Sequence, residues 1–515
     1  MRVTRDVVWA VLAVLILVMA GCTSDSDPEP EPGAFVEDLD VLWAATFGDP
    51  AGGSYSRYTD SDETNWRSRY QYADMTTMLP GSGVGDCGSD VNLPIGLFNL
   101  RQVYLFNGGG KPVGPPPEFR VGERPGIEFG PDGNGELDNR EQTLPAIELP
   151  VPDNPTREDF IRAANALLVL AAESGVEDPQ LALDYVLSPT MFHGHGSEDP
   201  TEAASDATSE SLTAAADATS SGAEGSTIWV IDFGLPADAD VTWPGNISGS
   251  QTQPRPPTDR LTSQYAHGLM VASAAAQAAP SASVEVIDVA YDIAGGNEAI
   301  SVRSIDQGLL STGILQDAKN GVLNFSIGSY HCPEVVGDDG SLLELNDDPQ
   351  FDALLAVLEP YLQRVPVVAA VGNDVTSEVL YPAGFDDVIG VAAIDETVPN
   401  TEACLDPEGG IFSWSPASSA PETCTVPSDP REAPFNNTSA VKEFRVGVDL
   451  VVDYPTFSAA NGGPVEYNYY GDDEKPYAGN PISLSTGKVR MSGTSLAAPV
   501  YAACLAGSSD GNPVC

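Results

Sequence analysis

The segment Thr-Ile-Trp-Val-Ile-Asp at residues 227–232 decides the fold, because it is a short apolar strand that ends on a carboxylate. Four further apolar runs of strand length follow, at residues 284–289, 322–327, 366–371 and 388–393. Helical segments separate several of them, at residues 267–279, 305–319 and 351–362. Strands that alternate with helices in this way are typical of a parallel sheet covered on both faces. The sequence therefore predicts an α/β fold with a doubly wound, mostly parallel sheet, preceded by a loosely organised N-terminal region.

Three chemically suited residues stand where such a sheet places its reacting groups, at strand ends and helix starts. Asp232 closes the first strand, and His267 is expected to begin the next helix. Ser495 lies in the segment Gly-Thr-Ser-Leu-Ala-Ala-Pro at residues 493–499. A Ser hydroxyl becomes a nucleophile when a His takes its proton, and an Asp orients that His. The order Asp, His, Ser is one of the known orders of this triad.

The Ser motif and the triad order resemble the subtilases, the subtilisin-like serine proteases. This resemblance implies that Asp232, His267 and Ser495 are catalytic. The remaining histidines, His193, His195 and His331, are interpreted as loop, structural or surface residues.

The resemblance also implies roles for two further segments. The strand that ends at Asn373 is similar to the subtilase strand that carries the oxyanion donor, and Asn324 is the competing candidate for that role. Ser326, Ile327 and Gly328 are similar to the segment that pairs with an extended substrate. The implied activity is hydrolysis of a polypeptide substrate through an acyl-enzyme.

The sequence departs from the family pattern near the triad. Phe233 stands where a Ser or Thr usually follows the Asp, and Leu269-Met270 replaces the usual Thr-His. A Pro-rich insertion covers about residues 396–482. These departures leave an alternative open, a catalytically silent subtilase-fold lipoprotein that binds a peptide or an envelope partner. A third hypothesis is a surface scaffold whose N-terminal region is the functional part.

The chain of 515 residues carries 23 basic and 75 acidic residues, a formal charge of −52. Such a surface repels phosphate, which argues against a nucleic-acid partner. The activity implied above requires no cofactor. Calcium is frequent among subtilases, and the acidic pairs at residues 338–339, 347–348 and 472–473 offer oxygen ligands, although acidic loops are usually only solvated. No metal site is assigned.

The N-terminus predicts export. Residues 1–21 combine two Arg with a short apolar run and small residues before Cys22, and this resembles a bacterial lipoprotein signal. An ordinary secretory signal is the alternative. The apolar run is too short to be a stable membrane-spanning helix. We expect an extracytoplasmic lipoprotein of the bacterial cell envelope, anchored through lipid on Cys22, with residues 22–34 as an acidic, Pro-rich tether.

Cysteine usage agrees with export. If Cys22 carries lipid, six cysteines remain and can form three disulfides in an oxidising compartment: Cys87, Cys332, Cys404, Cys424, Cys504 and Cys515. Fifteen pairings are possible. Pairing the nearest neighbours in sequence, 404 with 424 and 504 with 515, leaves Cys87 to bridge to Cys332.

Two regions precede the predicted catalytic domain of residues 227–515. Residues 35–195 include a short helix near 35–45, a helix at 156–174 that Gly175 ends, and a strand-like stretch at 183–188. Residues 196–226 are acidic and rich in Ala, Ser and Thr, which predicts a flexible linker. Residues 35–195 are either a pro-segment, released by a cut in the linker, or a permanent accessory domain.

Overall fold

The structure is a computed structural model of the whole chain. It describes residues 84–87, 96–114, 144–152, 154–189, 201–219, 222–236, 243–252, 262–293, 297–316, 320–373, 378–394, 433, 436–448, 450–454 and 487–508.

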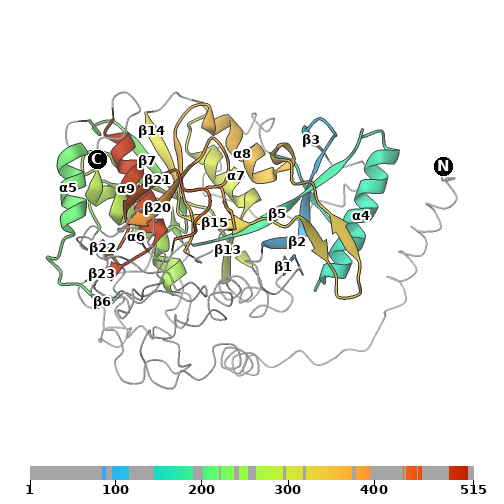
Figure 1. Cartoon of the computed structure of the whole chain (residues 1–515), viewed down its shortest axis with the longest axis horizontal. Helices are drawn as coiled ribbons and strands as arrows, with labels where there is room; N and C mark the ends of the chain where they lie inside the picture. Colours follow the sequence, from blue (N-terminus) through green and yellow to red (C-terminus); the bar gives the residue numbers. More distant parts are fainter. Residues whose placement is uncertain are drawn as a thin grey trace, which may run out of the picture. The chain divides into compact units, whose positions relative to one another are not determined.

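A parallel sheet forms the centre of the described part of the chain (Figure 1). Its strand order is β21-β20-β18-β14-β7-β11-β9, and every neighbouring pair is parallel. The strands are β7 (Thr227–Asp232), β9 (Ile247–Gly249), β11 (Ser283–Asp288), β14 (Gly321–Phe325), β18 (Val367–Ala370), β20 (Ile389–Ile394) and β21 (Glu443–Val446). The predicted doubly wound α/β fold is confirmed.

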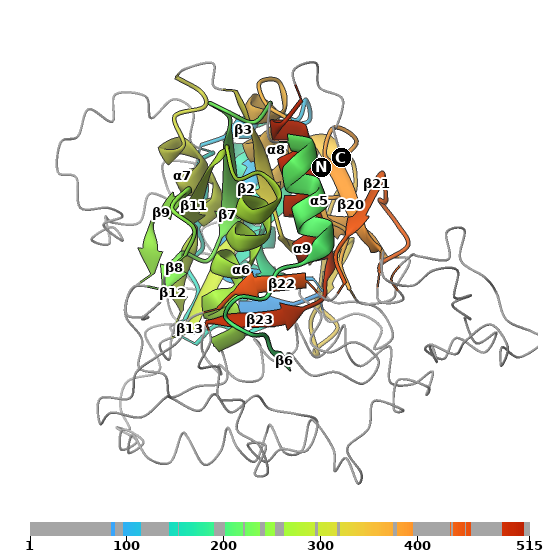
Figure 2. The same cartoon turned by 90° about the vertical axis from the view of Figure 1, so that its left-hand side faces the viewer.

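Helices cover both faces of this sheet. They are α5 (Glu210–Thr219), α6 (Thr262–Ala278), α7 (Val302–Ser311), α8 (Ala353–Leu362) and α9 (Thr494–Ala506). In β7, Ile228 and Val230 enter the core that α5, α6 and α9 share, whereas Trp229 and Ile231 enter the core with α7 and α8. Successive strand residues point to opposite faces, so one apolar strand supplies both cores. Figure 2 shows α5, α6 and α9 together on one side of the sheet.

A second sheet joins the N-terminal region to the catalytic part. Its described path is β1-β2-β5-β13-β12, and β3, β4, β15 and β19 pair at its sides. The strands are β1 (Val84–Asp86), β2 (Leu97–Phe106), β3 (Pro112–Val113), β4 (Ala146–Glu148), β5 (Gln180–Pro189), β12 (Ala290–Ile293), β13 (Asn297–Ser301), β15 (Ile327–Tyr330) and β19 (Leu380–Tyr381). The described residues of the N-terminal region share this sheet and one continuous core with the catalytic part.

Two predicted helices can be compared with the structure. Helix α4 (Arg157–Glu173) begins at a capping box in which Thr156 and Asp159 exchange hydrogen bonds, and Gly175 follows it at φ +93°, as the sequence predicts. Helix α7 was predicted at residues 305–319 and instead begins at Val302, because Ser301 caps it. The helix expected at residues 35–45 lies outside the described residues.

The prediction of a linker at residues 196–226 is wrong over the described part of that segment. Helix α5 forms there, and its Leu212 and Ala215 are buried against the core that includes α6 and α9. The Thr219 hydroxyl donates a hydrogen bond to the Ala278 carbonyl at 2.7 Å. Alanine is the best helix former, and a face of small residues suffices once neighbouring helices supply apolar surface.

The predicted insertion at residues 396–482 contributes secondary structure where it is described. It supplies β21 at the edge of the central sheet and β22 in a small sheet with β23 and β6. The smaller elements are β6 (Thr201–Glu202), β8 (Leu235–Pro236), β10 (Gln251–Thr252), β16 (Glu334–Val336), β17 (Leu342–Glu344), β22 (Leu450–Asp453), β23 (Lys488–Met491) and a 3₁₀ turn at Pro349–Phe351. Among the described residues, no helix is long and apolar enough to cross a membrane.

Candidate active site

Asp232 and His267 form a fully buried pair at the carboxyl end of the central sheet. Asp232 is the last residue of β7, and His267 lies on α6. The Nδ1 atom of His267 is 2.7 Å from Oδ1 and 2.8 Å from Oδ2 of Asp232. The backbone N–H of Phe233 donates to Oδ1 at 2.8 Å. The carboxylate therefore fixes the orientation of the imidazole ring from one side.

The approach of α6 to β7 depends on the residue after the histidine. A Cβ atom built on Gly268 would lie 1.8 Å from the Phe233 carbonyl oxygen, so only glycine fits at this contact. The sequence prediction that His267 begins its helix is wrong. Helix α6 begins at Thr262, since nothing in residues 262–266 breaks a helix, and His267 lies inside it.

Ser495 is the second residue of α9, and its side chain is fully buried. The alanines of α9 and α6 are small enough for the two helices to pack closely, and both belong to the same core. The Ser326 hydroxyl donates to the Ser495 carbonyl oxygen at 2.7 Å. Asn324 Nδ2 in turn donates to the Ser326 hydroxyl at 3.0 Å. The end of β14 is thus tied to the start of α9.

Asn373 also lies at the start of α9, although it is 121 positions from Thr494 in sequence. Its Oδ1 accepts a hydrogen bond from the backbone N–H of Thr494 at 2.9 Å. The Thr494 hydroxyl accepts one from the backbone N–H of Gly372 at 3.2 Å. These two bonds fix the Asn373 carboxamide beside Ser495. The Thr494 contact could not be predicted from local sequence, because it joins segments separated by the long insertion.

Two buried polar atoms of the site lack a hydrogen-bond partner within the described part of the chain. They are His267 Nε2 and Ser495 Oγ. The structure therefore brings Asp232 to His267, while the bond from His267 to Ser495 is not formed in it. Hydrogen bonds of this kind often close only when substrate binds. Outside the three candidate triad residues, Asn324 Oδ1 also lacks a partner among the described residues.

The segment expected to pair with substrate is already paired with this chain. Ile327 pairs with Pro189 and Gly328 with Ser188, in antiparallel register. Strand β5 of the N-terminal region thus lies on β15, beginning one residue after Ser326. This pairing was not predicted, because nothing local in residues 180–189 identifies a partner 140 residues away.

Metal ligation has no support in the described residues. No three His, Cys, Asp or Glu side chains among them are grouped so as to hold a metal ion. Asp338 contacts Arg157, and Asp348 caps the 3₁₀ turn. The acidic pair at 472–473 and Cys22 lie outside the described residues.

A family model described as the subtilase family, peptidase S8, matches residues 172–513. The chain belongs to the subtilase family. It is a serine peptidase. No protein with a curated description matches the chain.

Two solved structures are similar to this subtilase at low identity. A cold adapted subtilisin-like serine proteinase is 15% identical, with a TM-score of 0.32, and the match covers 57% of this chain and 79% of that one. The prenylagaramide maturation protease PagA is 14% identical, with a TM-score of 0.32, and the match covers 58% and 80%.

The histidine next to Cys332 has a structural place in the subtilase. His331 is stacked between Tyr185 of β5, at 4.3 Å between ring centres, and Tyr381 of β19, at 3.8 Å. Its Nδ1 lies 3.0 Å from Asp352 Oδ2. Burial lowers the pKa of His331, and the Asp352 carboxylate opposes that shift. The interpretation of His331 as structural is consistent with this packing.

Proposed function

We propose that the subtilase is an endopeptidase in which Asp232, His267 and Ser495 act as the catalytic triad. The buried contact between Asp232 and His267 is the observation that carries this proposal. Nδ1–H of His267 donates to the carboxylate, so Nε2 is left unprotonated and available as a base. His267 takes the Ser495 proton as Oγ attacks the scissile carbonyl, and then returns it to the leaving amine.

Asn373 is proposed as the oxyanion donor. Its Oδ1 accepts from the Thr494 N–H, and this bond holds the carboxamide beside the start of α9, where Ser495 lies. Negative charge on the former carbonyl oxygen would be stabilised there and by the N-terminal end of α9. Asn324 is less suited, because its amide nitrogen already donates to Ser326.

Covalent labelling tests this assignment. A fluorophosphonate probe reacts only with an activated serine, so peptide mapping of the labelled protein should find the phosphonyl group on Ser495 alone. Ser495→Ala should not be labelled. Absence of labelling in the wild-type protein, after removal of the N-terminal region, would favour the catalytically silent, peptide-binding alternative.

We further propose that the enzyme is exported and anchored to the bacterial envelope through lipid on Cys22. The lipoprotein-like signal at residues 1–21 supports this proposal. The disulfide between Cys87 and Cys332 also supports it, since such bonds persist in oxidising compartments. Cys22→Ala should move the protein from the membrane fraction to the soluble fraction. Unchanged membrane association would contradict the anchor.

Residues up to 189 are proposed as a pro-segment, because β5 pairs with the strand that we assign to substrate. The sequence alone predicts the proteolytic cut in residues 196–226. Because the described part of that segment is packed into the fold, we propose that the cut lies within residues 190–200. Mass spectrometry of the purified enzyme should give a fragment boundary in that window. An uncut and fully active chain would support a permanent accessory domain instead.

A further inference from the structure

Strand β5 competes directly with substrate for the backbone of β15. An extended substrate adds to a sheet edge through the strand's main-chain N–H and C=O groups. In this structure Ile327 and Gly328 pair with β5. Strand β5 also pairs with β13, through Val186 and Leu187. While β5 remains in place, a substrate strand cannot take the same position.

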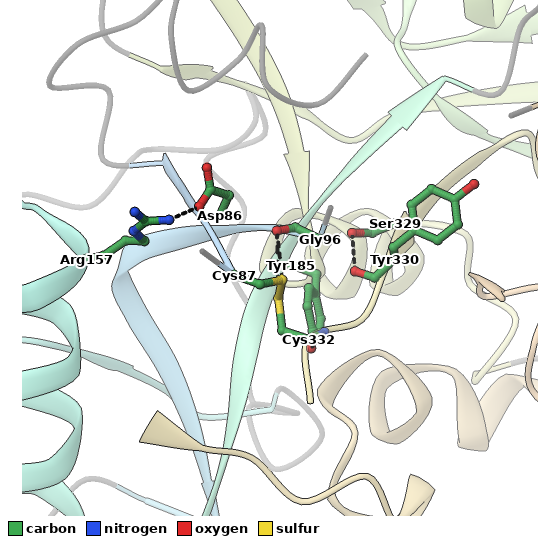
Figure 3. Close-up of a disulfide and its surroundings, with 8 residues drawn as sticks. All are labelled: Asp86, Cys87, Gly96, Arg157, Tyr185, Ser329, Tyr330 and Cys332. Carbon is green, nitrogen blue, oxygen red and sulfur yellow. Dashed lines mark hydrogen bonds and ion pairs between the residues drawn. A yellow bond between two sulfur atoms is a disulfide. The ribbon is translucent and has the colours of Figure 1, made fainter. Parts of the chain in front are cut away.

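A disulfide holds the N-terminal region beside that strand. Cys87 follows β1, and Cys332 lies two residues beyond the end of β15. The two cysteines are 245 positions apart in sequence, and their Cα atoms are 5.7 Å apart. Figure 3 shows the bridge next to Tyr185 of β5, whose hydroxyl accepts a hydrogen bond from the Cys332 backbone N–H at 3.0 Å. The covalent link therefore lies within a few residues of the pairing between β5 and β15.

Non-covalent contacts surround the bridge. Tyr185 stacks on His331, with the ring planes 7° apart. Arg157 of α4 forms ion pairs with Asp86, next to Cys87, and with Asp338 of the catalytic part. None of these contacts uses residues 190–200, so a cut in that window leaves all of them intact.

The Cys87–Cys332 disulfide determines whether a proteolytic cut releases the N-terminal region. Without a link, a cleaved inhibitor leaves on dilution, because its rebinding rate falls with its concentration. A short covalent link keeps its effective concentration in the millimolar range, whatever the protein concentration. We propose that the Cys87–Cys332 disulfide retains the N-terminal region on the substrate strand after the chain is cut, so that the two-chain enzyme stays inhibited. The inference rests on the proposed peptidase function and concerns how its site is regulated.

Activation then requires either destruction of the N-terminal region or opening of the bridge. A dithiol reductant opens it by passing two electrons and two protons to the S–S bond, which becomes two thiols, while the reductant becomes a cyclic disulfide. Cys87 and Cys332 are only 3% and 4% exposed, so reduction of the folded protein is slow. Replacing both cysteines is therefore a better test than reduction, because it removes the disulfide completely.

The experiment uses the full chain with the recognition sequence of an unrelated, site-specific endopeptidase placed within residues 192–199. Wild type and Cys87→Ser/Cys332→Ser are cut, and hydrolysis of a fluorogenic peptide per mole of enzyme is followed over a roughly thousandfold dilution. The bridged form should stay latent at every concentration. The double variant should gain at least about tenfold in specific activity as its inhibitor dissociates. Arg157→Gln is the matched control, because it removes ion pairs beside the bridge and keeps the disulfide, and it should stay latent.

Each result is decisive. If cut wild type and the double variant have the same activity at each dilution, the bridge does not retain the inhibitor and the inference is overturned, while the proposed function stands. If no form hydrolyses peptide or reacts with a fluorophosphonate, the proposed function fails and the inference falls with it. Should the double variant not fold, cut wild type that is reduced and alkylated replaces it, and must show the same gain on dilution.

Discussion

His267 Nδ1 lies within 2.8 Å of both carboxylate oxygens of Asp232, and neither side chain is exposed to solvent. During proton transfer the carboxylate stabilises the imidazolium ion that forms, because the opposite charges are close and shielded from solvent. It also holds one tautomer of the neutral ring. The relationship therefore prepares His267 for proton transfer at Nε2, the ring atom that faces away from Asp232.

Asp232→Asn should lower kcat/KM by roughly 10⁴, because an amide keeps the shape of the carboxylate but favours the wrong tautomer and gives no charge stabilisation. Steady-state kinetics on the activated enzyme measure the loss. Asp453→Asn is the control, since Asp453 is also a buried carboxylate and accepts from Ser273 at 2.7 Å. It should change stability more than kcat/KM. A loss below about tenfold for Asp232→Asn would contradict the role of Asp232.

Asn373→Ala should lower kcat by roughly 10² to 10³ with little change in KM, because an oxyanion donor acts on the transition state more than on bound substrate. The same kinetics on Asn324→Ala give the comparison. Asn324 donates to Ser326, so its loss should affect stability first. An equal fall in kcat for Asn324→Ala, with Asn373→Ala close to wild type, would reverse the assignment.

Gly268→Ala should separate α6 from the end of β7. The added Cβ would lie 1.8 Å from the Phe233 carbonyl oxygen, which is backbone and cannot move without the strand. A displacement of about 1 Å costs roughly 10² in rate, and the melting temperature should fall as well. Gly109→Ala serves as the control, because the nearest atom to its Cβ would be a side-chain oxygen at 3.4 Å. Wild-type kinetics for Gly268→Ala would show that the close contact is not required.

The fold should lose stability as pH rises, because the buried Asp306 carboxyl must ionise without full hydration. Burial raises the pKa of Asp306 to about 7, and its Oδ2 accepts from the Leu144 backbone N–H at 3.1 Å. A raised pKa stabilises the fold fully below the ordinary value near 3.8, and this contribution is lost as pH rises through about 7. The melting temperature should therefore fall over that range, and less steeply in Asp306→Asn. Asp206→Asn is the control, because Asp206 is exposed. If the melting temperature of Asp306→Asn falls with pH as steeply as that of wild type, this account is contradicted.

Five of the seven strands of the central sheet were predictable because each is a short apolar run, whereas β9 and β21 have no such run and were missed. Residues 227–232 supply both cores, so their apolar character is continuous and ends sharply at Asp232. The predicted start of α7, at residue 305, is three residues too late. Ser301 ends β13 and caps the helix directly, so no change in composition marks the boundary between the two elements. Local composition predicts which elements form more accurately than it predicts where they begin.

The missed features depend on long-range packing. Helix α5 has few large apolar residues, and its burial becomes visible only when α6 and α9 are in place. The pairing of β5 with β15 joins segments about 140 residues apart. The Cys87–Cys332 bridge occurs in three of the fifteen possible pairings, because the other four cysteines can pair in three ways, so the sequence alone did not decide it; the structure contains it.

Hydrolysis by Ser495→Ala tests the central claim most directly. Ser492→Ala is the matched control, because Ser492 is also buried and lies three residues earlier. Both variants are prepared in the cut, bridge-free form and assayed on the same fluorogenic peptide, with circular dichroism to check the fold. We predict that Ser495→Ala is folded and that its kcat falls by roughly 10⁶, with only the residual activity of the oxyanion donors left, while Ser492→Ala remains active. Peptide hydrolysis at the wild-type rate by Ser495→Ala would contradict the proposed triad.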